Sequence, residues 1–161
     1  MPVPRVIEPR DVSPDDRFAI VVSRYNESIT TKLLAGAVET LQAAGIADEQ
    51  VLVVHVPGAW EIPVAARQIA RGASVRAVLC LGAVIRGETT HDRHINRSVS
   101  LALQQVALES GKPVLFGILT CQSLEQAIQR SGGSVGNKGI ECARAALEMV
   151  GVCSALSQLD G

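Results

Sequence analysis

Residues 76–96, which read RAVLCLGAVI followed by RGETTHDRHIN, decide the fold of this chain. The first part is an almost unbroken apolar run of strand length, and Ile95, Val99, Leu103 and Val106 then recur at helical spacing. A strand that is apolar on both faces and leads through a short polar turn into a helix is typical of a parallel α/β sheet. Such sheets bind ligands beyond the carboxyl ends of their strands, so the polar turn is the first candidate for a functional site.

The rest of the chain repeats this alternation. Three further apolar runs predict strands, at residues 18–23, 51–56 and 113–120. Helical patterns fill the intervals, at about 28–44, 63–71, from the polar turn to 110, 123–130 and 138–150. We therefore expect an α/β fold, a three-layer α/β/α sandwich whose four-stranded parallel sheet has the flavodoxin-like order 2-1-3-4, with helices on both faces.

One domain, residues 17–150, accounts for this pattern, because 161 residues suit a single core. Residues 1–16 carry four prolines and several charges, which predicts an extended N-terminal arm. That arm either adds to the sheet edge of a neighbouring copy or remains disordered. Residues 151–161 are small and unpatterned, and we expect them to form a C-terminal tail.

Composition disfavours several classes of protein. The net charge of -1 and the pI of about 6.3 give no sign of nucleic-acid binding. No apolar run reaches the roughly 18–20 residues that span a membrane, and the N-terminus lacks a signal-peptide pattern, so we expect a cytoplasmic protein. Hydrophobic residues make up 47% of the chain, which predicts that some apolar surface lies in subunit contacts.

The cysteines show no pattern of a metal site. They form no CxxC pair and have no metal-type spacing with the histidines, and we expect all of them to be reduced and structural: Cys80, Cys121, Cys142 and Cys153.

The polar turns after the first three predicted strands should meet at one edge of the sheet, since parallel strands carry their carboxyl ends on the same side. These turns contain Tyr25, the pair Trp60 and Glu61, and residues 86–91. Two of only four aromatic residues therefore lie at the predicted crevice, and Phe116 belongs to the fourth predicted strand. This clustering favours a flat ring ligand held by stacking. The alternative is that Trp60 and Phe116 simply fill the core.

His91 is the candidate for proton transfer in this crevice. The pattern Thr89-Thr90-His91-Asp92 resembles a capping box, which predicts that His91 lies in the first turn of its helix. An exposed imidazole at the mouth of a crevice suits general acid–base chemistry. An ordinary solvent-facing helix start is the alternative.

Arg130 and Lys138 stand beside glycine-rich segments after the fourth predicted strand. A guanidinium in this place could grip a phosphate, although the helix dipole alone could account for Arg130. There is no GxGxxG after the first strand and no GxxxxGK[ST], so a dinucleotide fold and a P-loop are disfavoured.

Taken together, these motifs resemble those of the 6,7-dimethyl-8-ribityllumazine synthase family. The matching pieces occur in order over residues 17–150: RYNESIT at Arg24, VPGAWEIP at Val56, GAVIRGETTH at Gly82, GKPVLFGILT at Gly111, LEQAIQRSG at Leu124 and GNKG at Gly136. The resemblance implies a transferase that needs no cofactor. It would condense 5-amino-6-(D-ribitylamino)uracil with 3,4-dihydroxy-2-butanone 4-phosphate to 6,7-dimethyl-8-ribityllumazine, phosphate and water, the penultimate step of riboflavin biosynthesis.

The resemblance also implies roles for individual residues. His91 would be the catalytic proton-transfer residue. The ribitylaminouracil would be bound by Tyr25, Ala59, Trp60, Glu61, Ala83, Val84, Ile85 and, from a neighbouring subunit, Phe116. The butanone phosphate would be bound by Glu88, Thr89, Lys138 and, across a subunit boundary, Arg130. No metal is implied.

This chain departs from the family pattern at two places. The family usually has Phe or Trp at the position of Tyr25, and stacking survives that change. An aromatic residue usually follows the histidine, where this chain has Asp92-Arg93-His94. We expect that Asp92 could hold His91 in one tautomer.

Members of the family assemble as pentamers, decamers or hollow icosahedral shells, with active sites at subunit interfaces. The link SGGSVGNKG is short and lacks the insertion typical of pentamer-only members, which predicts the shell, a 60-mer of twelve pentamers. Two alternatives remain at this point, a non-catalytic flavin- or lumazine-binding shell protein and a riboflavin synthase of the related archaeal type. The presence of His91 and Arg130 disfavours the first, and the VPGAWEIP and GNKG motifs disfavour the second.

Overall fold

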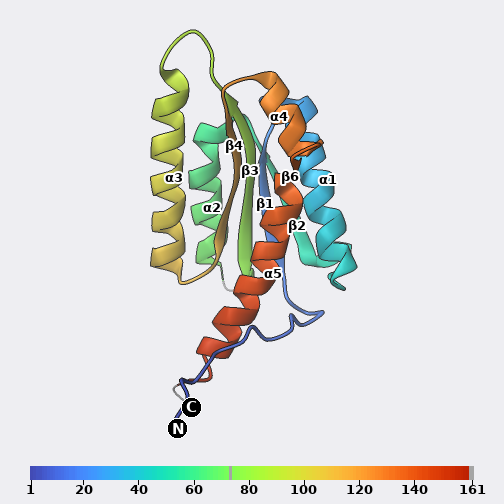
Figure 1. Ribbon diagram of the computed structural model, residues 1–161, viewed down its shortest axis with the longest axis vertical. Helices are drawn as coiled ribbons and strands as arrows, with labels where there is room; N and C mark the ends of the chain where they lie inside the picture. The colour runs from blue at the N-terminus through green and yellow to red at the C-terminus, as the bar shows by residue number, and fades with distance from the viewer. Residues whose placement is uncertain (73, 160–161) are drawn as a thin grey trace.

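The predicted strands form one parallel sheet in the computed structural model, which describes residues 1–72 and 74–159 (Figure 1). Its strands are β1 (Phe18–Ser23), β2 (Val51–Val56), β3 (Ala77–Ile85) and β4 (Val114–Cys121). They lie in the order β2-β1-β3-β4, and every neighbouring pair is parallel. The expected sheet order is therefore confirmed, and β2 and β4 are its edge strands.

Five α-helices surround the sheet: α1 (Glu27–Ala43), α2 (Ile62–Arg71), α3 (His91–Ser110), α4 (Leu124–Arg130) and α5 (Lys138–Leu156). A short 3-10 turn, η1 (Asp48–Gln50), precedes β2, and another, η2 (Ala59–Glu61), precedes α2. Figure 1 shows α2 and α3 on one face of the sheet and α1 and α5 on the other. The predicted α/β/α sandwich is confirmed.

The central strands β1 and β3 are buried on both faces because each layer of helices covers its own set of side chains. Phe18 and Ile20 of β1 point into the core formed with α1 and α5, whereas Ala19 and Val21 point into the core formed with α2 and α3. All of these side chains are 0% exposed. Burial on both faces explains why the strands are continuous apolar runs in the sequence.

Local signals set most helix ends where the sequence predicted them. Gly45 (φ 91°) and Gly111 (φ 68°) adopt the left-handed conformation just after α1 and α3, as expected of helix-terminating glycines. Pro63 lies in the first turn of α2. The glycine-rich link before α5 forms a small antiparallel hairpin of β5 (Ser131–Gly133) and β6 (Gly136–Asn137).

The end of α5 corrects a prediction. The helix continues to Leu156, beyond the predicted end at Val150, so most of the segment expected to be an unpatterned tail is helical. Gly151 lies inside the helix, where its missing side chain allows the backbone of the N-terminal arm to approach closely. A Cβ atom on Gly151 would lie 2.1 Å from the carbonyl oxygen of Arg10 in the N-terminal arm. Residues 160–161 of the expected tail lie outside the described residues.

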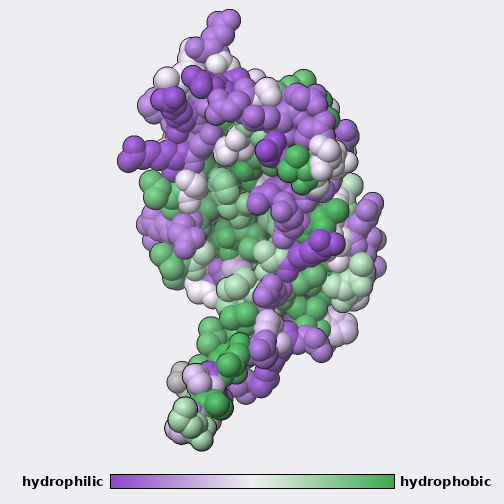
Figure 2. Space-filling model, viewed as in Figure 1, coloured by the Kyte–Doolittle hydropathy of each residue, from purple (hydrophilic) through white to green (hydrophobic). Residues whose placement is uncertain are grey.

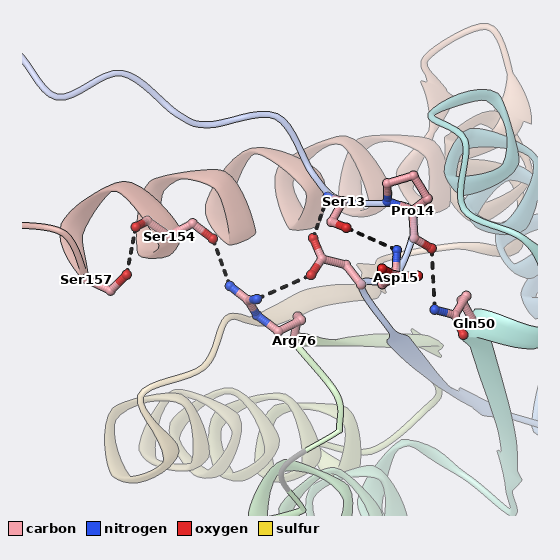
Figure 3. A network of polar contacts seen from close by, with 8 residues as sticks. Ser13, Pro14, Asp15, Gln50, Arg76, Ser154 and Ser157 are labelled. Atoms are coloured by element: carbon pink, nitrogen blue, oxygen red, sulfur yellow. Dashed lines mark hydrogen bonds and ion pairs between the residues drawn. The ribbon is translucent and has the colours of Figure 1, made fainter.

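The N-terminal arm has no strand or helix before the turn at residues 14–15. The backbone N–H of Arg10 donates to the carbonyl oxygen of Gly151 at 3.1 Å, which fixes the arm against α5. At the end of the arm, Asp16 pairs with the Arg76 guanidinium at 3.3 Å. The same guanidinium donates to the Ser154 hydroxyl of α5 at 2.8 Å (Figure 3). These contacts lie at the amino ends of the strands, opposite the edge predicted to carry the site. Among the described residues, no helix combines the length and the apolar character needed to cross a membrane.

Candidate active site

The turns at the carboxyl ends of β1, β2 and β3 enclose a cavity of about 500 Å³ with the start of α3. Its wall contains all but one of the residues predicted for the ring ligand, together with Thr89 and His91. The full lining is Tyr25, Gly58, Ala59, Trp60, Glu61, Ala83, Val84, Ile85, Gly87, Thr89, His91, Asp92 and Ile95. The sequence argument that these turns meet at one edge of the sheet is therefore confirmed. We call this space the β3 cavity.

Both rings of the β3 cavity are accessible. The side chain of Tyr25 is 73% exposed and that of Trp60 is 58% exposed. The alternative reading of Trp60 as a core residue is therefore wrong, because a core ring would be covered on both faces. Two exposed aromatic residues beside a cavity of this size can provide stacking surfaces for a flat heterocycle.

Backbone hydrogen bonds hold the turn after β1 in place. The N–H groups of Arg24 and Tyr25 donate to the carbonyl oxygens of Val56 and Pro57, at 2.8 and 2.9 Å. The side-chain amide of Asn26 donates to the carbonyl oxygen of Ala83 at 2.8 Å. Asn26 was not among the predicted site residues. The one local signal was its residue type at a helix start, since asparagine tolerates the left-handed conformation.

Glu61 organises the turn between β2 and α2. Its carboxylate oxygen Oε2 accepts a hydrogen bond from the backbone N–H of Gly58 at 3.0 Å. This bond closes the turn that carries Trp60 into the wall of the cavity. Pro63 then starts α2 without losing a hydrogen bond, because the first N–H groups of a helix have no partner within it.

His91 is the first residue of α3 and thus lies in its first turn, as predicted, and it is exposed at the β3 cavity. The predicted capping box is not formed. Thr90 occupies the N-cap position without a side-chain cap, and the Thr89 hydroxyl accepts from the backbone N–H of His91 at 3.3 Å instead. Because Thr89 and Thr90 are adjacent, the sequence alone did not show which of them takes the N-cap position.

Asp92 does not hold His91 as expected, since no hydrogen bond joins the two side chains within the described part of the chain. The Asp92 oxygen Oδ1 is buried and has no partner there. Asp92 borders both the β3 cavity and a second space of about 590 Å³, which it shares with Arg86, Arg93 and Phe116.

The remaining predicted residues lie elsewhere. Phe116, Arg130 and Lys138 line a separate cavity of about 380 Å³ on the other side of β4, which we call the β4 cavity. Phe116 is 39% exposed on this edge strand. Glu88 is exposed in the turn before α3 and lines neither cavity. Within one protomer, Phe116, Arg130 and Lys138 therefore line a different cavity from His91, whereas Glu88 lies in the same turn as His91.

The two cations of the β4 cavity are set by helix ends. Arg130 ends α4, and its guanidinium donates to the Gln126 carbonyl oxygen at 3.3 Å. Lys138 begins α5, where the Asn137 side-chain oxygen caps the N–H groups of Gly139 and Ile140 at 2.8 and 3.2 Å. The positive helix N-terminus and two cations suit an anionic group such as phosphate.

Cys121, at the end of β4, borders both the β4 cavity and the space of about 590 Å³. Burial raises the pKa of its thiol, and the neighbouring Arg130 guanidinium partly offsets that rise. The group is therefore a neutral thiol at pH 7. No group of three His, Cys, Asp or Glu side chains that could hold a metal ion occurs within residues 1–72 and 74–159.

Comparison with known proteins gives consistent matches. A family model described as 6,7-dimethyl-8-ribityllumazine synthase matches residues 15–154. Three similar proteins carry that same name. The one from Rhodopirellula baltica is 52% identical over 85% of this chain and 88% of its own length. The one from Desulfotalea psychrophila is 47% identical over 96% of this chain and 99% of its own length. The one from Salinibacter ruber is 50% identical over 83% of this chain and 85% of its own length.

Proposed function

The chain belongs to the 6,7-dimethyl-8-ribityllumazine synthase family, and on this premise we propose how its residues divide the family's reaction. It is an enzyme of riboflavin biosynthesis that forms 6,7-dimethyl-8-ribityllumazine. The two substrates in our proposal are 5-amino-6-(D-ribitylamino)uracil and 3,4-dihydroxy-2-butanone 4-phosphate. The observation that carries the proposal is the β3 cavity, in which His91 stands beside two exposed aromatic rings.

In this proposal the pyrimidine stacks on Tyr25. The backbone of Ala83, Val84 and Ile85 borders the ring and fixes its plane, because carbonyl and N–H groups at a strand end can read the polar edge of a heterocycle. The turn with Ala59, Trp60 and Glu61 holds the ribityl chain.

The butanone phosphate binds where Arg130 and Lys138 supply positive charge, with Glu88 and Thr89 on the opposite wall. The aromatic amine attacks the ketone and loses one water to give an imine, the phosphate leaves by elimination, and the ring closes with loss of a second water. Orientation of two substrates supplies much of the rate. His91 moves protons between these steps.

The site is completed by a neighbouring copy. The support is that Phe116 and Arg130 border a different cavity from His91 in one protomer, and that Phe116 is a partly exposed ring on an edge strand. Figure 2 shows a hollowed face with apolar side chains over β4, between α3 and α4, which suits contact with another subunit. We propose a pentamer, and twelve pentamers in an icosahedral shell. Native mass spectrometry that finds only pentamers would remove the shell.

We also place the enzyme in the cytoplasm. All four cysteines are free thiols, which is the usual state of cysteines in that compartment.

One assay tests the proposed function against its alternatives. Protein mixed with both substrates should form a product with the absorbance and fluorescence of the lumazine, and inorganic phosphate should appear in equal amount. A non-catalytic flavin- or lumazine-binding shell protein would form neither. A riboflavin synthase would instead consume the lumazine and produce riboflavin.

A further inference from the structure

We propose that Asn26 is a positioning residue for the pyrimidine subsite, and that it acts through the backbone of Ala83 without touching substrate. This inference rests on the proposed function for the identity of the ligand. Asn26 does not border the β3 cavity, whereas Tyr25 and Ala83 on either side of its hydrogen bond do.

The conformation of Asn26 is unusual. Within residues 1–72 and 74–159 it is the one residue other than glycine with a positive φ, at φ 60° and ψ 49°. Such a conformation is unfavourable for most L-residues, and asparagine is among the few that adopt it. Asn26 precedes α1 as its N-cap, yet its side chain does not cap the helix. The amide is used for a different bond.

That bond replaces a missing strand partner. The pairing between β1 and β3 ends at Val22 and Leu81, whereas β3 continues beside β4 as far as Ile85. From Gly82 onward, β3 has therefore lost β1 on one side. The Asn26 amide donates to the Ala83 carbonyl oxygen at 2.8 Å and satisfies a group at the position where the ladder has stopped.

The same turn is tied on its other side to β2. The N–H of Tyr25 donates to the carbonyl oxygen of Pro57 at 2.9 Å. Asn26 thus completes a link from the end of β2, through the Tyr25 turn, to the end of β3. The distance between the Tyr25 ring and the Ala83–Ile85 backbone sets the width of the slot for a flat ring, so loss of the Asn26 bond should loosen this slot.

Three variants separate the bond from the backbone conformation. Asn26→Asp keeps the size of the side chain but faces the Ala83 carbonyl oxygen with an acceptor. Asn26→Gly removes the side-chain N–H donor, and glycine adopts the positive φ without strain. Asn26→Ala removes the donor and also strains the backbone. The matched control is Gly111→Ala, which places alanine at φ 68° at the far end of the sheet, with no atom within 4 Å of the added Cβ.

We expect the KM to change for only one of the two substrates. Asn26→Gly and Asn26→Asp should raise the KM for the ribitylaminouracil by about 3–10-fold, which is the loss of one hydrogen bond, and should leave kcat and the KM for the butanone phosphate within about twofold. Gly111→Ala should lower the Tm through backbone strain while both KM values stay unchanged. An unchanged KM for the ribitylaminouracil in both donor-free variants, or an equal rise for both substrates, would overturn the proposal.

A second measurement needs no substrate. Hydrogen exchange on the ligand-free protein should show faster exchange of the Tyr25 amide and of the amides after Ala83 in Asn26→Gly and Asn26→Asp, and no such change in Gly111→Ala. Unaltered exchange at these amides would overturn the proposal by itself. If the wild-type protein formed no lumazine, the proposed function would fail, and this measurement would still decide the role of Asn26.

Discussion

His91 and Arg130 border two different cavities of the same protomer, the imidazole at the start of α3 and the guanidinium at the end of α4. The edge strand β4 separates them, with Phe116 exposed along it. Under the proposed function both groups act on one substrate pair, and we therefore propose that β4 of one copy faces the β3 cavity of the next.

This arrangement predicts complementation between variants. His91→Ala and Arg130→Ala should each be poor catalysts at a low concentration of butanone phosphate. When the two are unfolded and refolded together, random mixing in a closed ring should restore intact sites at about one position in four, each combining His91 of one copy with Arg130 of another. The measurement is the rate of lumazine formation by the mixture. A mixed assembly no more active than the sum of its separate variants would contradict a shared site.

The His91 imidazole is predicted to assist proton transfer without being indispensable. His91→Ala should slow turnover by about 10–100-fold, the low end of general acid–base contributions, because imine formation proceeds unaided. His94→Ala is the matched control, since His94 is exposed one helical turn away and borders no described cavity. Steady-state rates of both variants check this. Full activity in His91→Ala would remove the proton-transfer role.

Removal of the Arg130 side chain should act on one substrate. Arg130→Ala should raise the KM for the butanone phosphate far more than that for the ribitylaminouracil, because a guanidinium–phosphate contact is lost. Arg144→Ala removes an exposed guanidinium on α5 that borders neither cavity, and it should leave both values unchanged. Equal effects of the two substitutions on the KM of the phosphate substrate would show that Arg130 acts only through general charge.

The sequence was sufficient to predict the strands, the helices and the sheet order, which depend on the spacing of apolar residues. The continuous apolar run of β3 reports burial on both faces, and the alternation of strand and helix leads to the sheet order that is observed. The gathering of Tyr25, Trp60 and His91 follows from strand direction alone. These features are set by local pattern and by the general rules of parallel sheets.

Contacts between distant segments could not be predicted in the same way. The Asn26 amide meets a carbonyl oxygen 57 residues further along the chain, and nothing near Asn26 in the sequence specifies that partner. Gly151 shows the same limit. A glycine near the end of a helix favours termination, but here it is needed because the backbone of Arg10 lies against it, and α5 continues to Leu156.

The close contact between α1 and α5 leads us to a further prediction about stability. A Cβ on Gly139 would lie 1.9 Å from the carbonyl oxygen of Leu33, a backbone atom that cannot move without displacing α1. Gly139→Ala should therefore cost at least the upper part of the about 1–3 kcal/mol that overpacking usually costs. Chemical denaturation measures this. Gly87→Ala is the control, since its Cβ would meet nothing within 4 Å, and equal stability of the two variants would show that α1 and α5 separate freely.

The buried thiols predict a loss of stability at alkaline pH. Burial raises the pKa of Cys142 from its ordinary value of 9.0 to about 12, and it raises the pKa of Cys80 well above that ordinary value. Below pH 9 these thiols are protonated in both the folded and the unfolded chain, so their contribution to stability is complete. Between pH 9 and about 12 the unfolded chain loses the Cys142 proton while the folded chain keeps it. Unfolding then releases a proton, and the free energy of unfolding falls as the pH rises.

Replacement of the Cys142 thiol should remove its part of this slope. In Cys142→Ala the free energy of unfolding should fall less steeply between pH 9 and 11, by up to about 1.4 kcal/mol per pH unit, which corresponds to one proton. Denaturant unfolding at a series of pH values measures the slope. Cys153→Ala is the control, because Cys153 lies near the end of α5 and is only partly buried. Since the shift comes from burial in the core between α5 and the sheet, equal slopes for Cys142→Ala and the wild type would mean that this core admits water at alkaline pH.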